Sequence, residues 1–382
     1  MFIPVVAAIV ATEKAVPILT VTLMSIAFYA SSALFAVFVG RWADTRGSHA
    51  TMIGVGLSLL STSLLGFFVS IALTAGSLLA TLAVISSIIA GFGSAFYHPL
   101  AATVLQGIFL AKSKGKALGV NGAAGGLGAT TYPVLFFFAA ILLSRGGAFI
   151  LLALIGFAAS LIIPLGLSGR TMKQRVRNGD GSSKAREALT RGIVILTVVT
   201  AVRSISAAGV TFWLPTYIST QKGAGIGTLL GLTLGVMYAT AIIGQLLFGV
   251  LVDRFDKRFV LGIGSAGSAL STLGYIFTSG TIEFLFIALF GLFTFSIFPT
   301  LLALASEYVP DTSSSLANSL VWGLGITGGS VIGPLVVGVI VGNNLPGLNI
   351  AFELMVVTGI IGALVTPLMP RPMRAAKPVL MN

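Results

Sequence analysis

Hydrophobic runs longer than about 20 residues, enough for a helix to cross the hydrocarbon core of a bilayer, recur along the whole chain. Hydrophobic residues make up 56% of the 382 residues and charged residues only 8%. A soluble globular domain carries roughly 25% charged residues. Because no strand-like alternation of about ten residues repeats, an outer-membrane barrel is not expected. The sequence therefore predicts an all-α membrane protein with many spans.

The apolar runs predict eleven complete spans and one fragment. The fragment, residues 1–12, would reach only ~18 Å as a helix before Glu13 and Lys14 interrupt it. We interpret it as the outer end of a truncated first helix whose first half is missing from this sequence; an interfacial anchor is the alternative. The complete spans are expected at about 18–40, 49–72, 78–108, 116–143, 147–167, 192–217, 228–252, 259–280, 283–306, 314–341 and 350–369.

A polar, basic connector over residues 168–191 divides the chain into two hydrophobic halves of near-equal length. It holds seven Lys or Arg residues against two acids. This layout is typical of membrane transporters built from two parallel repeats. We therefore expect an N-terminal helix bundle over 1–167 with an incomplete first span, a C-terminal bundle over 192–370, and a tail over 371–382.

The positive charges predict how the chain is oriented. If the connector lies in the cytoplasm and successive spans alternate sides, only Lys14, Arg145 and Lys222 fall outside. Short loops rich in Lys and Arg stay in the cytoplasm. We therefore expect a multi-pass protein of the cell (inner or plasma) membrane with a cytoplasmic connector and tail. Nucleic acid, which a net charge of +12 would suggest for a soluble chain, is not an expected partner. The 18 cytoplasmic residues are Arg41, Arg46, Lys112, Lys114, Lys116, the seven of the connector, Arg254, Lys257, Arg258, Arg371, Arg374 and Lys377.

Three sets of anchor residues recur at nearly one offset. A Gly-x-x-x-Asp pattern returns after 209 residues, a Gly followed by Pro eight residues later returns after 200, and a third Gly and Pro return after 201. The offsets indicate a two-fold internal repeat of six spans. The sets are Gly40 and Asp44 with Gly249 and Asp253, Gly91 and Pro99 with Gly291 and Pro299, and Gly122 and Pro133 with Gly323 and Pro334.

At these residues the chain resembles the major facilitator superfamily, over essentially its whole length. The loop signature of that family after the second span is Gly-x-x-x-Asp-Arg/Lys-x-Gly-x-Arg/Lys-Arg/Lys. Gly40, Asp44 and Gly47 match it, and Arg46 stands one place late. The second copy, Asp253 to Arg258, keeps the basic residues and lacks the glycine. The resemblance implies two six-helix bundles related by pseudo-two-fold symmetry, which rock about a site at the midplane of the membrane.

The signature residues are candidates for a cytoplasmic gate: Asp44, Arg46, Asp253 and Arg254. Small Gly40 and Gly249 would let helices approach closely. Each aspartate precedes a helix, where a carboxylate suits the positive end of the helix dipole. A neighbouring arginine could tie that carboxylate to another loop and hold the cytoplasmic side shut. The alternative is that these are plain solvated loop charges.

Phe96-Tyr97-His98-Pro99, followed by a glycine-rich fifth span, is most similar to the fosmidomycin-resistance-type branch of drug exporters. The fifth-span antiporter signature of the family has Gly-Pro, which is present as Gly333-Pro334 in the second half; Tyr132-Pro133 stands in the first. Ser87 occupies the place of the usual fourth-span arginine. The branch implies proton-coupled export of a drug-like compound.

Arg203 lies near the middle of the 192–217 span with no acid within a helical turn. An unpaired guanidinium in lipid costs at least a few kcal/mol, so Arg203 should face a polar cavity or a partner on another helix. Its planar fork pairs oxyanions bidentately, which points to a substrate carboxylate or other anion. The structural alternative is a hydrogen-bond clamp to backbone carbonyls.

His98 is the only titratable group of the fourth span, and imidazole titrates near physiological pH. We weigh a proton carrier or substrate ligand against a packing histidine beside Pro99. No Asp or Glu lies in the core of a complete span, so the coupling carboxylate is in the missing half-helix, absent, or replaced by His98. Further candidates for a central cavity, each of which could equally be packing glue between helices, are Asn121, Tyr238, Gln245, Asn318 and Trp322.

The sequence thus favours a secondary active transporter that exports a small organic or drug-like solute in exchange for protons. If Arg203 binds the solute, that solute is an anion. Uptake of an organic anion by symport is the alternative, since Arg203 would serve either direction. A membrane-embedded enzyme or a sensor is remote: the chain has two histidines and no cysteine, and no large soluble domain. We expect no cofactor and no metal site, and a monomer surrounded by membrane lipid.

Overall fold

The structure is a computed structural model that describes residues 2–14, 16–46, 49–108, 114–167, 189–309, 317 and 320–371. Within these, the side chains of 36–37, 40–46, 97–99, 101–108, 114–121, 253, 299, 302 and 306 are not described. All statements below concern the described part. Most of the connector and of the C-terminal tail lies outside it.

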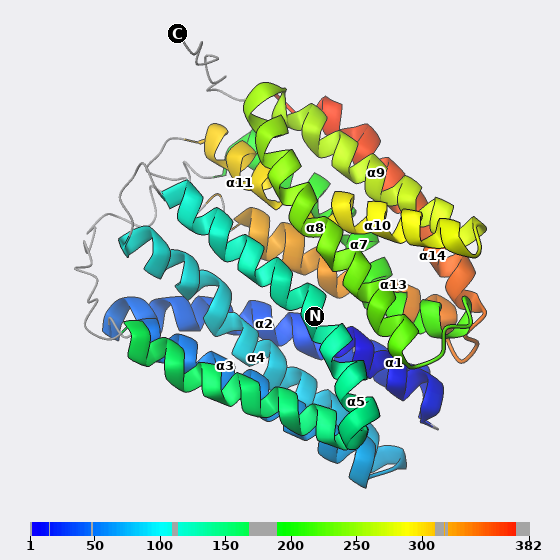
Figure 1. Cartoon of the computed structure of the whole chain (residues 1–382). Coiled ribbons are helices and arrows are strands. Elements are labelled where there is room, and N and C mark those ends of the chain that lie inside the picture. The colour runs from blue at the N-terminus through cyan, green and yellow to red at the C-terminus, as the bar shows by residue number, and fades with distance from the viewer. Residues whose placement is uncertain are drawn as a thin grey trace. The chain divides into compact units, whose positions relative to one another are not determined.

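Every regular element in the described ranges is helical, as predicted (Figure 1). Nine helices there, with the interrupted α5 counted as one, are long and apolar enough to cross a membrane, and α1 and α10 are shorter apolar helices. The elements are α1 (Ile3–Glu13), α2 (Ile18–Arg46), α3 (His49–Phe68) with η1 (Val69–Leu73), α4 (Gly76–Ile108), α5 (Lys114–Leu167), α7 (Arg191–Thr220), α8 (Thr228–Arg254), α9 (Lys257–Phe277), α10 (Thr281–Phe295), α11 (Phe298–Glu307), η4 (Val321–Thr327), α13 (Gly328–Val341), α14 (Gly347–Val365) and η5 (Thr366–Leu368).

Two helices are interrupted, one as expected and one not. The 54-residue α5 is broken at Ser144, whose φ of 71° is outside the helical region, so the predicted spans 116–143 and 147–167 are separate helices. The predicted span 283–306 is wrong as a single helix, because α10 ends at Phe295 and α11 begins at Phe298. Pro299 has no N–H to donate to the carbonyl four residues earlier, which explains the break.

The described helices form two compact units: Met1–Arg177 with Trp213–Gly235, and Asn178–Phe212 with Val236–Asn382. In the first unit α4 packs against both α2 and α3, and α3 packs against α5. In the second unit α9 packs against α10 and α14. These units describe packing alone, and the six-span halves inferred from the sequence stay a prediction.

The two units repeat one helix–helix interface in detail. In the first, the Ser31 hydroxyl on α2 donates to the Ile88 carbonyl on α4 at 3.2 Å. In the second, the Thr240 hydroxyl on α8 donates to the Ala288 carbonyl on α10 at 2.6 Å. Three residues after each carbonyl is a glycine where a Cβ would collide with the facing backbone: Gly91 against the Phe28 carbonyl and Gly291 against the Met237 carbonyl.

The partners of this interface are offset by 209 residues on one side (Ser31 and Thr240) and by 200 on the other (Ile88 and Ala288). These are the offsets of the sequence anchors. A hydroxyl and a small residue together let two helices approach closely in a membrane, which explains why the pattern is present in both copies.

The fragment at the start of the chain forms a buried helix. Residues Ile3 to Val10 of α1 are all buried. The Phe2 ring contacts the rings of Tyr132, Phe136 and Phe149 edge-on, with centroids 4.9 to 5.4 Å apart. A helix covered on every side belongs to a core. This burial is unlike the interfacial anchor that the sequence left open, because such a helix keeps one face in the headgroups.

Candidate functional site

The break between α10 and α11 is where predicted site residues meet in the second unit. Arg203 comes from the middle of α7 and is 8% exposed. Its Nη2 donates a hydrogen bond to the Thr294 carbonyl at 2.5 Å, across 91 residues of sequence. Thr294 is the next-to-last residue of α10, where helical carbonyls lose their usual donors. Arg203 therefore satisfies a carbonyl beside the break.

This contact is the one that the structural alternative for Arg203 predicts. It does not account for the whole guanidinium: the buried Nε has no hydrogen-bond partner. No carboxylate among the described residues forms an ion pair with it. A carbonyl dipole does not cancel a full positive charge, and an uncompensated buried charge is costly. At this site Arg203 is thus bound to one backbone carbonyl, and its positive charge has no negative partner among the described residues.

Thr294 is held from a second side. Its hydroxyl lies 2.7 Å from the Ser268 hydroxyl of α9, so α7, α9 and α10 meet at one residue. Sequence reasoning missed Ser268 and Thr294. The signal that could have found Thr294 is its position five residues before Pro299, where a break was to be expected.

Two predicted aromatic residues contact the ends of the same break. The buried Tyr238 of α8 places its ring 5.3 Å from that of Phe295, the last residue of α10. Trp322 of η4 is 37% exposed and packs edge-on against Phe298, the first residue of α11, at 4.9 Å. Four elements, α7, α8, α9 and η4, therefore contact residues at the break between α10 and α11.

The other predicted residues are placed less fully. Gln245 is partly buried on α8, next to Gly244, where a Cβ would collide with Ser296 and the Leu292 carbonyl. The side chains of His98 and Asn121 lie on described helices but are not themselves described, and Asn318 lies outside the described residues. Their roles stay predictions.

The glycine of the Gly333-Pro334 signature has a packing role. A Cβ on Gly333 would collide with the Ile205 carbonyl of α7. One turn earlier, Gly329 faces the Ala201 carbonyl and Ser204 in the same way. The signature of α13 therefore brings this helix onto the stretch of α7 that carries Arg203.

The gate residues predicted from the loop signature are only partly placed. The side chains of Asp44, Arg46 and Asp253 are not described, and Arg254 is exposed at the end of α8. The expectation that Gly249 allows a close helix contact is wrong, because a Cβ there would meet nothing within 4 Å. Instead, two later residues of the loop, Asp256 and Arg258, connect it to a neighbouring segment.

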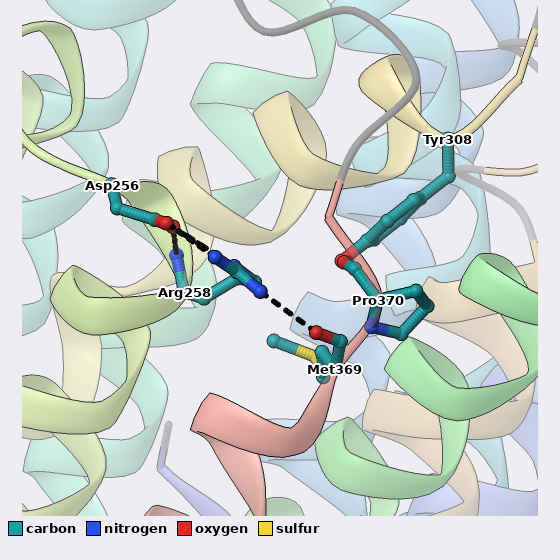
Figure 2. A network of polar contacts seen from close by, with 5 residues as sticks. All are labelled: Asp256, Arg258, Tyr308, Met369 and Pro370. Carbon is teal, nitrogen blue, oxygen red and sulfur yellow. Dashed lines mark hydrogen bonds and ion pairs between the residues drawn. The ribbon is translucent and has the colours of Figure 1, made fainter.

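Asp256 and Arg258 form the centre of that network (Figure 2). Asp256 caps α9 by accepting from the backbone N–H of Arg258 at 2.9 Å, and accepts from the Arg258 guanidinium Nη2 at 2.6 Å. Arg258 Nη1 then donates to the Met369 carbonyl at 2.8 Å. The hydrogen bond from the Arg258 side chain, with the nearby charge of Arg371, lowers the pKa of Asp256 below its usual 3.8.

Neighbouring contacts extend the network to α11 and to the start of α7. The Tyr308 hydroxyl donates to the Pro370 carbonyl at 2.7 Å (Figure 2), and burial raises the pKa of Tyr308 to about 12. Lys257 forms an ion pair with Glu307 at 2.7 Å. The Thr190 hydroxyl donates to the Tyr308 carbonyl at 3.2 Å. The ends of α7, α9, α11 and η5 are therefore fastened to one another.

Comparison with known proteins identifies the family of this arrangement. The family model of the Major Facilitator Superfamily matches residues 1–321 and 227–380. A Haemophilus influenzae protein whose name assigns it provisionally to metabolite transport is 30% identical over 159 residues, which is 41% of this chain and 38% of that protein. The chain thus spans well under half the length of this relative.

Solved structures share the fold at low sequence identity. A D-xylose-proton symporter superposes with a TM-score of 0.78 at 14% identity, covering 97% of this chain and 94% of that one. A nucleoside transporter gives 0.77 at 11%, covering 96% and 95%. A bacterial homologue of the human lysosomal transporter Spinster, in an inward-facing, unoccupied conformation, gives 0.76 at 16%, covering 98% and 96%.

Proposed function

The chain belongs to the Major Facilitator Superfamily, and we propose that it is a secondary active transporter of a small organic, anionic solute. It works by alternating access in the cell membrane, with the connector 168–191 and the C-terminus in the cytoplasm. Proton-coupled export is the proposed direction, and a monomer is the working unit. Placement in the fosmidomycin-resistance-type branch rests on Phe96-Tyr97-His98-Pro99 and is part of the same proposal.

The observation that carries this proposal is the broken helix with Arg203 beside it. Transporter sites are commonly formed where discontinuous helices leave backbone groups and helix ends exposed to a ligand. Here the break is surrounded by a guanidinium, two aromatic rings and the hydroxyls of Ser268 and Thr294. Rings suit an apolar body and the guanidinium suits an oxyanion. An organic anion fits this set of groups.

The missing counter-charge supports an anionic solute over a neutral one. A solute carboxylate would replace the Thr294 carbonyl, or join it, as acceptor for Arg203 and would supply the negative charge that the described protein does not. Release of the Thr294 carbonyl would in turn loosen α10 from α7. Binding and movement of the broken helix would then be linked at one residue.

Coupling to protons is proposed for His98. Among the acids of the described helices, Glu283 and Glu307 lie in the first or last turn of α10 and α11, and Glu353, the seventh residue of α14, is exposed. A histidine is the side chain whose charge changes near physiological pH without special perturbation. The cytoplasmic gate is proposed for Asp44, Arg46, Asp253 and Arg254, with the Asp256–Arg258 network fastening the helix ends behind it.

Uptake by symport is the second candidate, because Arg203 would serve either direction. One solved neighbour of the same fold is named as a symporter of D-xylose with protons. Both directions would use the same site, so the sign of the flux separates them.

The test is transport by purified protein in liposomes under an imposed pH gradient, with a panel of labelled aromatic and aliphatic carboxylates and their neutral amides as matched solutes. Antiport predicts flux of a carboxylate against the proton flow, and symport predicts flux with it. Arg203→Ala should abolish binding of the carboxylate while the protein stays folded. His98→Gln should flatten the pH dependence of the flux.

The matched control is Arg191→Ala, which removes an exposed charge at the start of α7, the helix that carries Arg203, and should leave solute affinity unchanged. Equal transport of a carboxylate and its amide, or unchanged affinity in Arg203→Ala, would reject the anion site.

A further inference from the structure

One arginine joins three segments of the first unit at the end away from the connector. Arg145 follows the break at Ser144 in α5, and its side chain is 41% exposed. Its Nη1 forms an ion pair with the carboxylate of Glu13, the last residue of α1. Its Nη2 donates to the Ile226 carbonyl at 3.3 Å, in the loop between α7 and α8. We call this set, Glu13, Arg145 and Ile226, the Arg145 clamp.

The turn that presents Arg145 is fixed by its neighbours. Ser144 has a φ of 71°, and its hydroxyl accepts from the Gly147 N–H at 3.3 Å. A Cβ on Gly146 would collide with the ring of Phe68 on α3. Arg145 therefore extends from a turn that is packed on a neighbouring helix, and its reach toward both partners is constrained.

Close helix packing accompanies the clamp. A Cβ on Gly231 of α8 would collide with the Phe137 ring and lie 3.1 Å from the Pro133 carbonyl of α5. One turn later, Gly235 faces Val134 and the Thr130 carbonyl. Two small residues four apart allow such an approach between membrane helices. The start of α8 thus lies directly on α5, next to the loop that Arg145 holds.

These contacts join parts of the two sequence repeats. By sequence, α1 and α5 belong to the first repeat and residues 213–235 to the second, although 213–235 pack in the first unit. Alternating access requires the repeats to separate on one side of the membrane at a time. This end can therefore open only if Ile226 leaves Arg145 and the glycines of α8 leave α5.

We propose that the Arg145 clamp is a latch that holds the protein closed at this end, which is the outer end in the proposed orientation. A single guanidinium serves two acceptors, so its loss releases α1 and the α7–α8 loop together. Partly exposed ion pairs contribute little to stability. Two conformations of a transporter differ by only a few kcal/mol, so a weak contact present in one of them still changes their populations. The latch goes beyond the proposed function and rests on its alternating-access part alone.

The experiment measures the opening directly, because the chain has no cysteine and can be labelled at chosen sites. Ala75→Cys, in the loop between η1 and α4, and Ala224→Cys, near Ile226, would carry spin labels in protein reconstituted in lipid nanodiscs. We expect Arg145→Ala to raise the ratio of long-distance to short-distance populations about two- to fivefold. Arg145→Lys keeps the charge, but one ammonium cannot serve both acceptors well, so it should give a smaller rise.

A charge exchange distinguishes the two halves of the clamp. Glu13→Arg with Arg145→Glu restores the ion pair between α1 and α5, but a glutamate cannot donate to the Ile226 carbonyl. If that carbonyl is the latch, the exchanged protein stays open. Full return to the closed distance would overturn the role of Ile226 and so the latch as proposed.

Lys14→Ala is the matched control, since it removes a positive charge at the same end next to Glu13. It should leave the distances unchanged. Unchanged distances in both Arg145 variants, or an equal shift in the Lys14 variant, would overturn the proposal. The measurement needs no solute and no pH gradient, so its failure is distinct from failure of the proposed transport.

Discussion

Arg203 and Asp256 show two solutions for a charged side chain in a mostly apolar chain. Asp256 lies at a helix end, where it accepts hydrogen bonds from the backbone N–H and from the guanidinium of Arg258. Arg203 is buried and has one backbone carbonyl for a full charge. The carboxylate of Asp256 therefore has an opposite charge beside it within the protein. The charge of Arg203 is compensated only in part, and we connect that shortfall with a ligand.

Asp256 gives a prediction at this scale. Asp256→Ala removes the cap of α9 and the partner of Arg258, which should cost about 1 kcal/mol at neutral pH. The pKa of Asp256 is lowered in the folded protein, so its contribution is complete above its usual value of 3.8. The contribution disappears as the pH falls through the lowered folded-state pKa. Thermal unfolding in detergent should therefore distinguish wild type from Asp256→Ala at pH 7 and progressively less in acid.

Asp256→Asn is the matched variant, because an amide oxygen can still cap the helix but carries no charge for Arg258. It should lie between the two proteins at pH 7. A difference between wild type and Asp256→Ala that stays constant into strong acid would contradict the assignment.

At the scale of elements, glycines decide which helices can approach one another. Gly91 and Gly291 stand at the same place in the repeated interface, each facing a backbone carbonyl that cannot move cheaply. Gly249, which belongs to the loop signature, faces open space. The packing role of a glycine therefore cannot be read from its place in a motif.

We expect Gly291→Ala to destabilise the protein severely, because the added methyl would overlap the Met237 carbonyl; overpacking of a close contact costs about 1–3 kcal/mol or more. Gly91→Ala should behave in the same way. Gly249→Ala should be neutral or stabilising by about 0.5–1 kcal/mol, since alanine favours a helix interior over glycine. Size-exclusion profiles and melting temperatures in detergent would test this. A loss at Gly249 as large as that at Gly291 would contradict it.

For the whole molecule, the charge pattern predicts which side of the membrane each loop occupies, and it places the Arg145 clamp at the outer end. The loop that holds Ala224 should lie outside the cell and the connector inside, because the basic residues are concentrated in the connector and in the segments on its side. In the cysteine-free chain, a membrane-impermeant maleimide applied to intact cells should label Ala224→Cys. It should label Ser182→Cys in the connector only after permeabilisation. The reverse pattern would contradict the orientation.

Much of the fold could be predicted from sequence because its signals are local or periodic. The length of each apolar run gives a helix, and the break at Ser144 was expected between two such runs. The equal offsets of Gly91 and Gly291 indicated a repeat that the Ser31 and Thr240 interfaces now show in detail. The break before Pro299 was not predicted, because residues 283–306 are apolar enough to suggest one continuous span, and the small polar residues Thr294 and Ser296 beside the break are compatible with a membrane helix.

The sequence by itself determined the helical membrane class, the near-complete set of spans and the two-fold repeat, because hydrophobic length and residue spacing are properties of the chain alone. It also singled out Arg203 as a residue that needs a partner. Only the tertiary structure decided that the partner is the Thr294 carbonyl, and that Arg145 joins Glu13 to Ile226. These contacts link residues 91 and 132 positions apart, and backbone carbonyls are present at every residue. Which carbonyl loses its helical N–H donor depends on where a helix breaks. Which carbonyl an arginine side chain contacts depends on how the helices pack.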